Sequence, residues 1–175
     1  MNITIDKYKI RNKIILKDLN IKILDSKINL IIGKNGIGKT TFLNIITNLY
    51  NKYQNIKLFS YIPNNMIFPH NLNVLEYLLY FNKDLKKIIN LMTYFDLEDK
   101  KIKNLSKGMI QKLLIIQTVI INRRIYLFDE IETGLDEQSI IKLKQYLINF
   151  KKTLIITTHS KEKFEDISDN ICLLK

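Results

Sequence analysis

One stretch of the sequence decides the fold: Gly33-Lys34-Asn35-Gly36-Ile37-Gly38-Lys39-Thr40. Its spacing is G-x-x-x-x-G-K-[ST], in which glycines let the backbone curl so that several N–H groups point at one anion. A short apolar run, residues 28–32, precedes it, and residues 39–50 have the pattern of a helix. The start of that helix adds a favourable partial charge for an anion. We therefore predict a phosphate-binding loop between a buried strand and a helix.

The residue types also predict how a nucleotide would bind. Lys39 would reach the β- and γ-phosphates of ATP, and the Thr40 hydroxyl would ligate Mg²⁺. The predicted nucleotide-binding residues of the loop are Gly33, Lys34, Asn35, Gly36, Ile37, Gly38, Lys39, Thr40 and Thr41. A GTPase should carry N-K-x-D to read guanine, but Asn51-Lys52-Tyr53-Gln54 lacks the aspartate. The chain has only three arginines, which leaves little for the lid of a small-molecule kinase.

Further elements follow from hydrophobic patterning. Residues 3–10, 14–23, 57–62, 125–128, 153–158 and 171–174 are predicted strands, besides 28–32. Predicted helices cover two parts of 72–96 that separate near Asn82, then 106–122, 136–150 and a short segment after Ser160. Strands alternate with helices on either side of an all-helical block, about 66–122. We therefore predict a single α/β domain, 1–175, with a mainly parallel sheet and a helical insert.

A pair of acids ends a predicted strand. Asp129 and Glu130 follow the apolar residues 125–128, at the sheet edge where ligands bind in open α/β folds. Asp129 would orient Mg²⁺ or a water on it, and Glu130 would polarise the water that attacks the γ-phosphate. His159 ends another strand and would hydrogen-bond the γ-phosphate and that water, provided that the two strands are neighbours. His70 has no such context and receives no role.

Ser106 opens a predicted helix, with Gly108 in its first turn. Such a helix start is a second anion site, and Gly108 permits close backbone approach. A serine N-cap is common in ordinary helices, so this pattern is weak on its own.

Taken together and in order, these motifs resemble the nucleotide-binding domain of ABC transporters along essentially the whole chain. The resemblance implies a P-loop NTPase fold with a small antiparallel β-subdomain, here trimmed. It implies an ATPase with Glu130 as catalytic base and His159 as switch histidine. It also implies a head-to-tail dimer of two ATP-binding subunits, homomeric or heteromeric. In that dimer Ser106 and Gly108 of one subunit contact the γ-phosphate of ATP held on the other, and Asp136, in the D-loop, makes a contact between the two sites. Tyr8 is placed like the aromatic residue that stacks on adenine.

Two departures from the family pattern affect what we expect. The signature usually reads L-S-G-G-Q, but here it is Leu105-Ser106-Lys107-Gly108-Met109, a variant similar to that of exporter subunits. Asn64 stands where glutamine is usual, as a ligand of Mg²⁺ or its water. We therefore expect an exporter's ATPase subunit that docks on a separate transmembrane permease, on the cytoplasmic face of a membrane.

The alternative is a soluble ABC ATPase that acts on ribosomes, nucleic acid or a protein assembly scaffold. The formal net charge of +11 keeps it open. However, the lysines are scattered, and the abundance of Ile, Lys and Asn is what A/T-rich codons would produce. We therefore expect no direct binding of nucleic acid.

Overall fold

The computed structural model covers the whole chain. It describes all residues except 55–57, 62–65 and 175, and it describes no side chains between 49 and 54. The chain divides into two compact units. The sheet unit contains Met1–Tyr61, Arg123–Ile131 and Phe150–Lys175, and the helical unit contains Ile62–Asn122 and Glu132–Asn149.

Five parallel strands form the centre of the sheet unit. Their order is β4 (Phe59–Tyr61), β5 (Ile125–Asp129), β6 (Thr153–Thr158), β3 (Ile28–Ile32) and β7 (Asn170–Leu173). The three middle strands are almost entirely buried, as predicted for residues 28–32 and as is typical of the inner strands of a parallel sheet. Because all strands run the same way, the carboxyl ends of β5, β6 and β3 meet at one edge.

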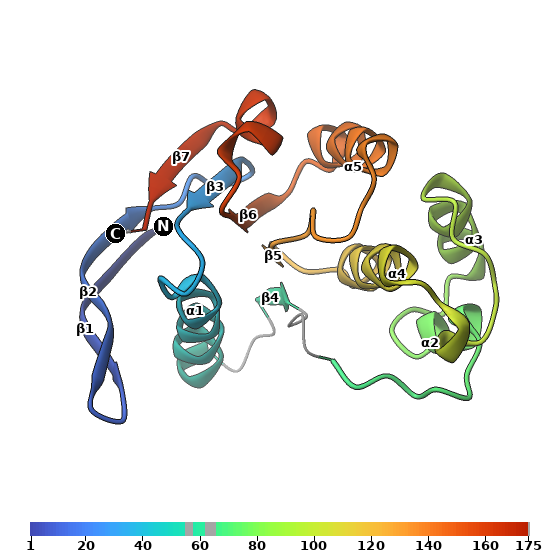
Figure 1. The fold of residues 1–175 in the computed structure, drawn as a ribbon, viewed down its shortest axis with the longest axis horizontal. Helices are drawn as coiled ribbons and strands as arrows, with labels where there is room; N and C mark the ends of the chain where they lie inside the picture. The colour runs from blue at the N-terminus through green and yellow to red at the C-terminus, as the bar shows by residue number, and fades with distance from the viewer. Residues whose placement is uncertain (55–57, 62–65, 175) are drawn as a thin grey trace. The chain divides into compact units, whose positions relative to one another are not determined.

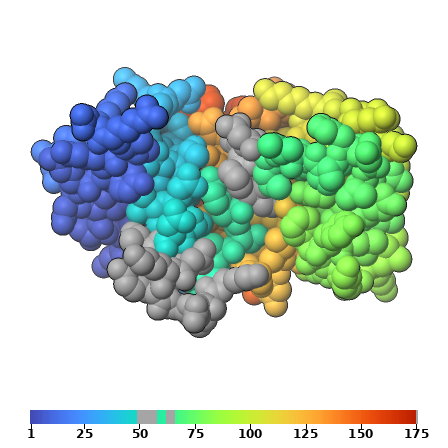
Figure 2. Space-filling model, turned by 90° about the horizontal axis from the view of Figure 1, so that it is seen from below, coloured from blue at the N-terminus to red at the C-terminus, as the bar shows by residue number. Residues whose placement is uncertain are grey.

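An antiparallel hairpin adds the second layer of the sheet unit. It consists of β1 (Asn2–Ile10) and β2 (Lys13–Lys22), which are the small antiparallel sheet that the sequence predicted. Helix α1 (Lys39–Gln54) lies beside the hairpin in both views (Figures 1 and 2). Fully buried Phe42, Leu43 and Ile46 of α1 belong to one core with apolar residues of the hairpin and of the sheet. Burial of this helix between two sheets therefore fixes where its first turn lies.

The described part of the helical unit contains four α-helices and one 3₁₀ turn, Ile102–Asn104. The α-helices are α2 (Val74–Leu79), α3 (Leu85–Tyr94), α4 (Lys107–Ile120) and α5 (Glu137–Asn149). A buried hydrogen bond joins α2 to α4, from the Tyr77 hydroxyl to Gln117 Oε1 at 2.7 Å. Another contact joins α3 to α5, from the Tyr94 hydroxyl to the Lys142 carbonyl at 3.0 Å. In the described part of the chain, no helix combines the length and apolar character that crossing a bilayer requires.

Most predicted elements are present, but the segment after Ser160 differs. Instead of an α-helix, two short 3₁₀ turns follow, Lys161–Lys163 and Glu165–Ile167. The Ser160 side chain caps neither turn. Its backbone N–H donates to the Thr158 hydroxyl at 2.9 Å, which ties this residue to the end of β6. Helix α1 is also four residues longer than the predicted 39–50, because it ends at Gln54.

Candidate nucleotide site

The loop between β3 and α1 has the backbone that a phosphate cradle needs. Gly36 and Gly38 have φ angles of 77° and 111°, a region that side chains disfavour. A side chain on Gly38 would also be crowded, because a Cβ there would lie 3.0 Å from side-chain atoms of both Ile15 and Leu16. The hairpin therefore packs directly on the loop, which holds the curled conformation that the sequence predicted.

Lys39, the first residue of α1, reaches back into this loop with its side chain. Its side chain is only 4% exposed, and Nζ donates to the carbonyl oxygens of Gly33 at 2.8 Å and of Lys34 at 3.1 Å. Nζ also lies 3.0 Å from Glu130 Oε1. The lysine charge is thus held where the loop curls, and it faces one of the two acids that end β5.

Asp129 is held between two threonine hydroxyls. Thr40 Oγ1 donates to Asp129 Oδ2 at 2.5 Å, and Thr157 Oγ1 donates to Oδ1 at 2.6 Å. Asp129 and Thr157 are direct partners in the β5–β6 ladder. Thr40 and Asp129 are the two described residues that were predicted to bind Mg²⁺. The structure brings them together.

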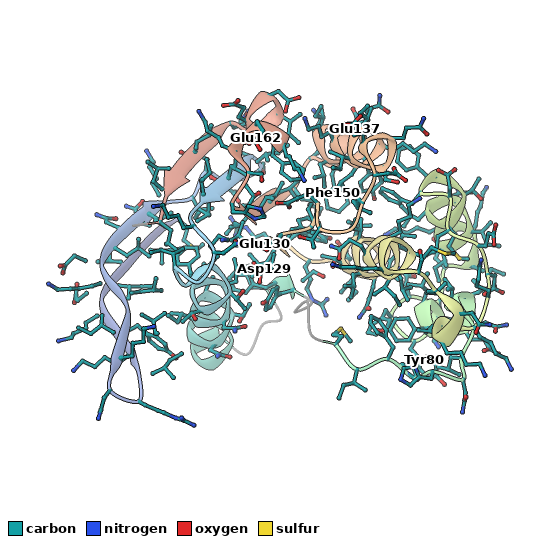
Figure 3. All side chains as sticks on the ribbon, in the orientation of Figure 1. Tyr80, Asp129, Glu130, Glu137, Phe150 and Glu162 are labelled. Carbon is teal, nitrogen blue, oxygen red and sulfur yellow. The ribbon has the colours of Figure 1, made fainter. Side chains whose placement is uncertain are left out.

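Glu130 lies immediately after β5 in a left-handed conformation, with φ of 49°. Its N–H donates to the Thr157 carbonyl at 2.9 Å, which stabilises this turn. Figure 3 shows Asp129 and Glu130 side by side at the end of the strand. The nearer histidine nitrogen, His159 Nδ1, lies 3.8 Å from Glu130 Oε1. Because β5 and β6 are neighbours, the condition on which the His159 prediction rested is confirmed.

Three predicted residues belong to the helical unit. Ser106 is the N-cap of α4, and its hydroxyl accepts from the Met109 N–H at 3.2 Å, as predicted. Gly108 approaches Gly134 so closely that a Cβ on it would lie 2.8 Å from the Gly134 carbonyl oxygen. Asp136 caps α5 by accepting from the Ser139 N–H at 2.7 Å, and the hydrogen bonds from Ser139 lower the pKa of its carboxyl.

Two predicted residues remain, Tyr8 and Asn64. Tyr8 lies on β1 and is 38% exposed. It pairs with Leu16, whose side chain packs against Gly38 in the loop, so its part of the hairpin neighbours the phosphate cradle. Asn64 lies outside the residues that the structure describes.

Comparison with known proteins identifies the family. A family model described as ABC transporter matches residues 16–133. The chain belongs to this family. It is an ABC-type ATP-binding domain, and the order of loop, acid pair and sheet described above is that of an ABC ATPase.

Several curated ABC proteins are similar to the chain. An uncharacterized ABC transporter ATP-binding protein of Methanocaldococcus jannaschii is 30% identical, and the match covers 94% of this chain and 70% of the relative. A cytochrome c biogenesis ATP-binding export protein of Reclinomonas americana is 28% identical, over 85% of this chain and 80% of the relative. A phosphate import ATP-binding protein of Borreliella afzelii is 29% identical, over 88% of this chain and 75% of the relative. Relatives thus include both export and import proteins.

Solved ABC structures share the fold. One, titled as the ATP binding subunit of an ABC transporter, has a TM-score of 0.86 at 21% identity and covers 99% of this chain and 85% of that one. Another, titled as the dimeric structure of a bacterial ABC transporter cassette, has a TM-score of 0.77 at 24% identity and covers 97% of this chain and 91% of that one. The parallel sheet, the small antiparallel sheet and the helices are therefore those of an ABC cassette.

The oxygen atoms at this site fit Mg²⁺, which takes part of its coordination from water and substrate. They do not fit a metal ion that protein side chains alone would hold. Among the described residues, no three His, Cys, Asp or Glu side chains gather to hold a metal ion. The Thr40 hydroxyl and the Asp129 carboxylate, the described residues predicted to bind the metal, lie together instead. Mg²⁺ prefers such hard oxygen ligands, and it keeps waters and binds substrate phosphates for the rest of its coordination.

Sequence reasoning missed two hydroxyls beside Asp129. Thr157 was seen only as part of a strand end, although a threonine pair at the carboxyl end of a buried strand was a usable signal. The second is Tyr61, at the end of β4, whose hydroxyl oxygen is buried with no hydrogen-bond partner among the described residues. Burial, and to a lesser extent the Asp129 charge, raise the pKa of Tyr61, so this hydroxyl stays protonated near Asp129.

Proposed function

We propose that this chain hydrolyses Mg-ATP as the energy-supplying subunit of an ABC exporter. The observation that carries the proposal is the convergence of Lys39, Asp129 and Glu130 at one edge of the sheet. Lys39 contacts Glu130, and Asp129 contacts Thr40, the residue after Lys39. The lysine proposed to bind phosphate, the pair proposed to bind the metal and the candidate base thus lie within direct reach of one another.

Each of the predicted site residues would have a separate role in hydrolysis. Backbone N–H groups of 33–41 would bind the phosphates, and Lys39 would exchange its Glu130 partner for the γ-phosphate. Thr40 and Asp129, with Asn64, would hold Mg²⁺, which neutralises charge on the β- and γ-phosphate oxygens when bound. Glu130, released from Lys39, would accept a proton from the attacking water, and His159 would hydrogen-bond that water and the γ-phosphate. Tyr8 would stack on the adenine ring.

A second ATP-binding subunit would complete each site. Ser106 and Gly108 would contact the γ-phosphate held on the opposite subunit, and Asp136 would make a contact between the two sites, as the family resemblance implies. Ser106 is the N-cap of α4, and the start of a helix is a favourable place for an anion, which supports this role. Closure of the dimer on ATP and its release after hydrolysis would be the motion that drives a partner.

Within the proposed transporter role, we propose export as the direction of transport. The Lys107-Gly108-Met109 variant of the signature favours an exporter, and one of the relatives is named as an export protein. A separate permease on which the chain docks at the cytoplasmic face of a membrane would supply the transmembrane path.

One experiment tests the transporter role apart from the chemistry. The tagged chain is recovered from detergent-solubilised host membranes with ATP and Mg²⁺, and its partners are identified by mass spectrometry. We expect stoichiometric recovery of a polytopic membrane protein, lost in the Lys39→Ala chain if docking needs nucleotide. Recovery only with ribosomes, nucleic acid or a scaffold protein would overturn the transporter role and favour a soluble ABC ATPase.

A further inference from the structure

Thr157 contacts both acids of the site. It is fully buried on β6, and its hydroxyl donates to Asp129 Oδ1 at 2.6 Å. Its carbonyl accepts from the Glu130 N–H at 2.9 Å. A single residue therefore holds the carboxylate of one acid and the backbone of the next.

The two contacts come from different parts of Thr157. The bond to Glu130 uses the backbone, so any residue that keeps β6 in register preserves it. The bond to Asp129 uses the hydroxyl, which a side-chain change can remove. A substitution that removes the Thr157 hydroxyl can therefore affect the position of the Asp129 carboxylate while the backbone contact to Glu130 remains.

The hydroxyl contact restricts how the Asp129 carboxylate can turn. Thr40 holds Oδ2 from the phosphate loop, and Thr157 holds Oδ1 from the neighbouring strand. With one oxygen fixed on each side, the plane of the carboxylate is set before any ligand arrives. Groups that orient a metal ligand in this way typically change metal affinity by about 10- to 100-fold when they are removed.

We propose that Thr157 is a positioning residue for magnesium, acting through its hydroxyl on the Asp129 carboxylate. This inference rests on the proposed function, in which Asp129 serves the metal of Mg-ATP. Thr157 itself would touch neither the metal nor the nucleotide. Its loss should therefore raise the magnesium requirement while leaving binding of metal-free nucleotide as it is.

Thr157→Val tests the inference, because valine has nearly the shape of threonine and lacks the hydroxyl. A matched control is Thr153→Val at the opposite end of β6. The Thr153 hydroxyl also donates to a carboxylate, that of Asp25 at 2.8 Å, and Thr153 is also buried. Both variants lose a threonine–carboxylate hydrogen bond from the same strand, but only one loses it beside the phosphate loop.

The readout is binding of a fluorescent mant-labelled ATP, titrated with Mg²⁺ and repeated in EDTA. We expect Thr157→Val to need about tenfold more Mg²⁺ for half-maximal enhancement of binding, with unchanged affinity in EDTA. Thr153→Val and Thr157→Ser, which keeps the hydroxyl, should match the wild type. If the valine chain does not fold, Thr157→Cys, a weak donor of similar size, should shift the requirement in the same direction.

The outcomes separate this inference from the proposed function. An unchanged magnesium requirement in Thr157→Val, or an equal shift in Thr157→Ser or Thr153→Val, would overturn the role of the Thr157 hydroxyl alone. A wild-type chain that binds no mant-labelled ATP at any Mg²⁺ concentration would overturn the proposed function, and the role of Thr157 with it.

Discussion

Lys39 and Glu130 form an ion pair, with Lys39 Nζ 3.0 Å from Glu130 Oε1, in a part of the site where the lysine is buried and the glutamate is 26% exposed. Each of these residues has a separate predicted task once ATP is present. The lysine would bind phosphate, and the glutamate would accept a proton from water. In the structure each partners the other, so under the proposed function ATP would have to displace the glutamate from the lysine before Glu130 could act as a base.

Glu130→Gln should abolish hydrolysis without weakening ATP binding. Loss of a general base lowers the hydrolysis rate by about 100-fold or more. Glutamine no longer competes as a charge for Lys39, so ATP affinity should be equal to or higher than that of the wild type. The checks are steady-state phosphate release, nucleotide affinity, and gel filtration with ATP for a trapped dimer. Exposed Glu162→Gln is the control, and a wild-type hydrolysis rate in Glu130→Gln would refute the base assignment.

Lys39→Ala should weaken nucleotide binding itself. The lysine would make charge-assisted hydrogen bonds to phosphate, whose loss costs about 1.5–3 kcal/mol, or roughly 10- to 100-fold in affinity. Equilibrium titration with ATP measures the change. Lys161→Ala removes a charge from the exposed ion pair with Glu165 and should leave affinity unaltered. Equal affinities for wild type and Lys39→Ala would contradict the phosphate-loop assignment.

Gly108→Ala should destabilise the helical unit even though alanine favours helices. The better helix propensity of alanine contributes at most about 1 kcal/mol near a helix start. Its Cβ would lie 2.8 Å from the Gly134 carbonyl oxygen, a backbone atom that cannot turn away, and such overpacking costs about 1–3 kcal/mol. The clash should win, which urea unfolding would detect. Lys107→Ala, at the exposed neighbouring position, should change stability by under about 0.5 kcal/mol; a stabilised Gly108→Ala chain would show that Gly134 moves freely.

Asn29→Ala should lower the free energy of unfolding by about 2–3 kcal/mol, because the Asn29 side chain is fully buried and hydrogen-bonded to backbone groups. Its amide donates to the carbonyl oxygens of Leu24 at 2.9 Å and Leu154 at 3.2 Å, and its oxygen accepts from the Leu24 N–H at 2.8 Å. Alanine would leave these backbone groups without that partner. Denaturant unfolding measures the loss, with exposed Asn20→Ala as the control. An equal loss of unfolding free energy in both variants would contradict the role given to the Asn29 hydrogen bonds.

Asp169 should make stability depend on acid pH. The backbone N–H of Ile28, and next the Lys27 side chain, hold the pKa of its carboxyl below the ordinary value of about 3.9. A carboxyl with a depressed pKa in the folded state stabilises the protein above the unfolded pKa, and this contribution disappears as the pH falls through the folded pKa. Unfolding midpoints between about pH 7 and 3 should therefore fall less steeply in Asp169→Asn than in the wild type. Parallel curves for the two chains would contradict this.

Much of the site could be predicted because its signals are local. The phosphate loop lies within one turn of chain, and its glycines and lysine sit at a spacing that the backbone itself requires. Ser106 and Asp136 are caps whose partners are three residues away. The alternation of strands with helices, which hydrophobic patterning shows, predicted a parallel sheet.

What the sequence by itself determined is therefore the set of parts: the phosphate cradle, the acid pair, the helix caps and the α/β class. Only the tertiary structure decided which parts meet. The strand order set Thr157 beside Asp129, and α1 set Thr40 on the other side of it. Packing likewise set Gly134 against Gly108. Such contacts join residues that are far apart in the chain, and hydrophobic periodicity reports only which face of an element is buried, so their choice depends on how whole elements pack.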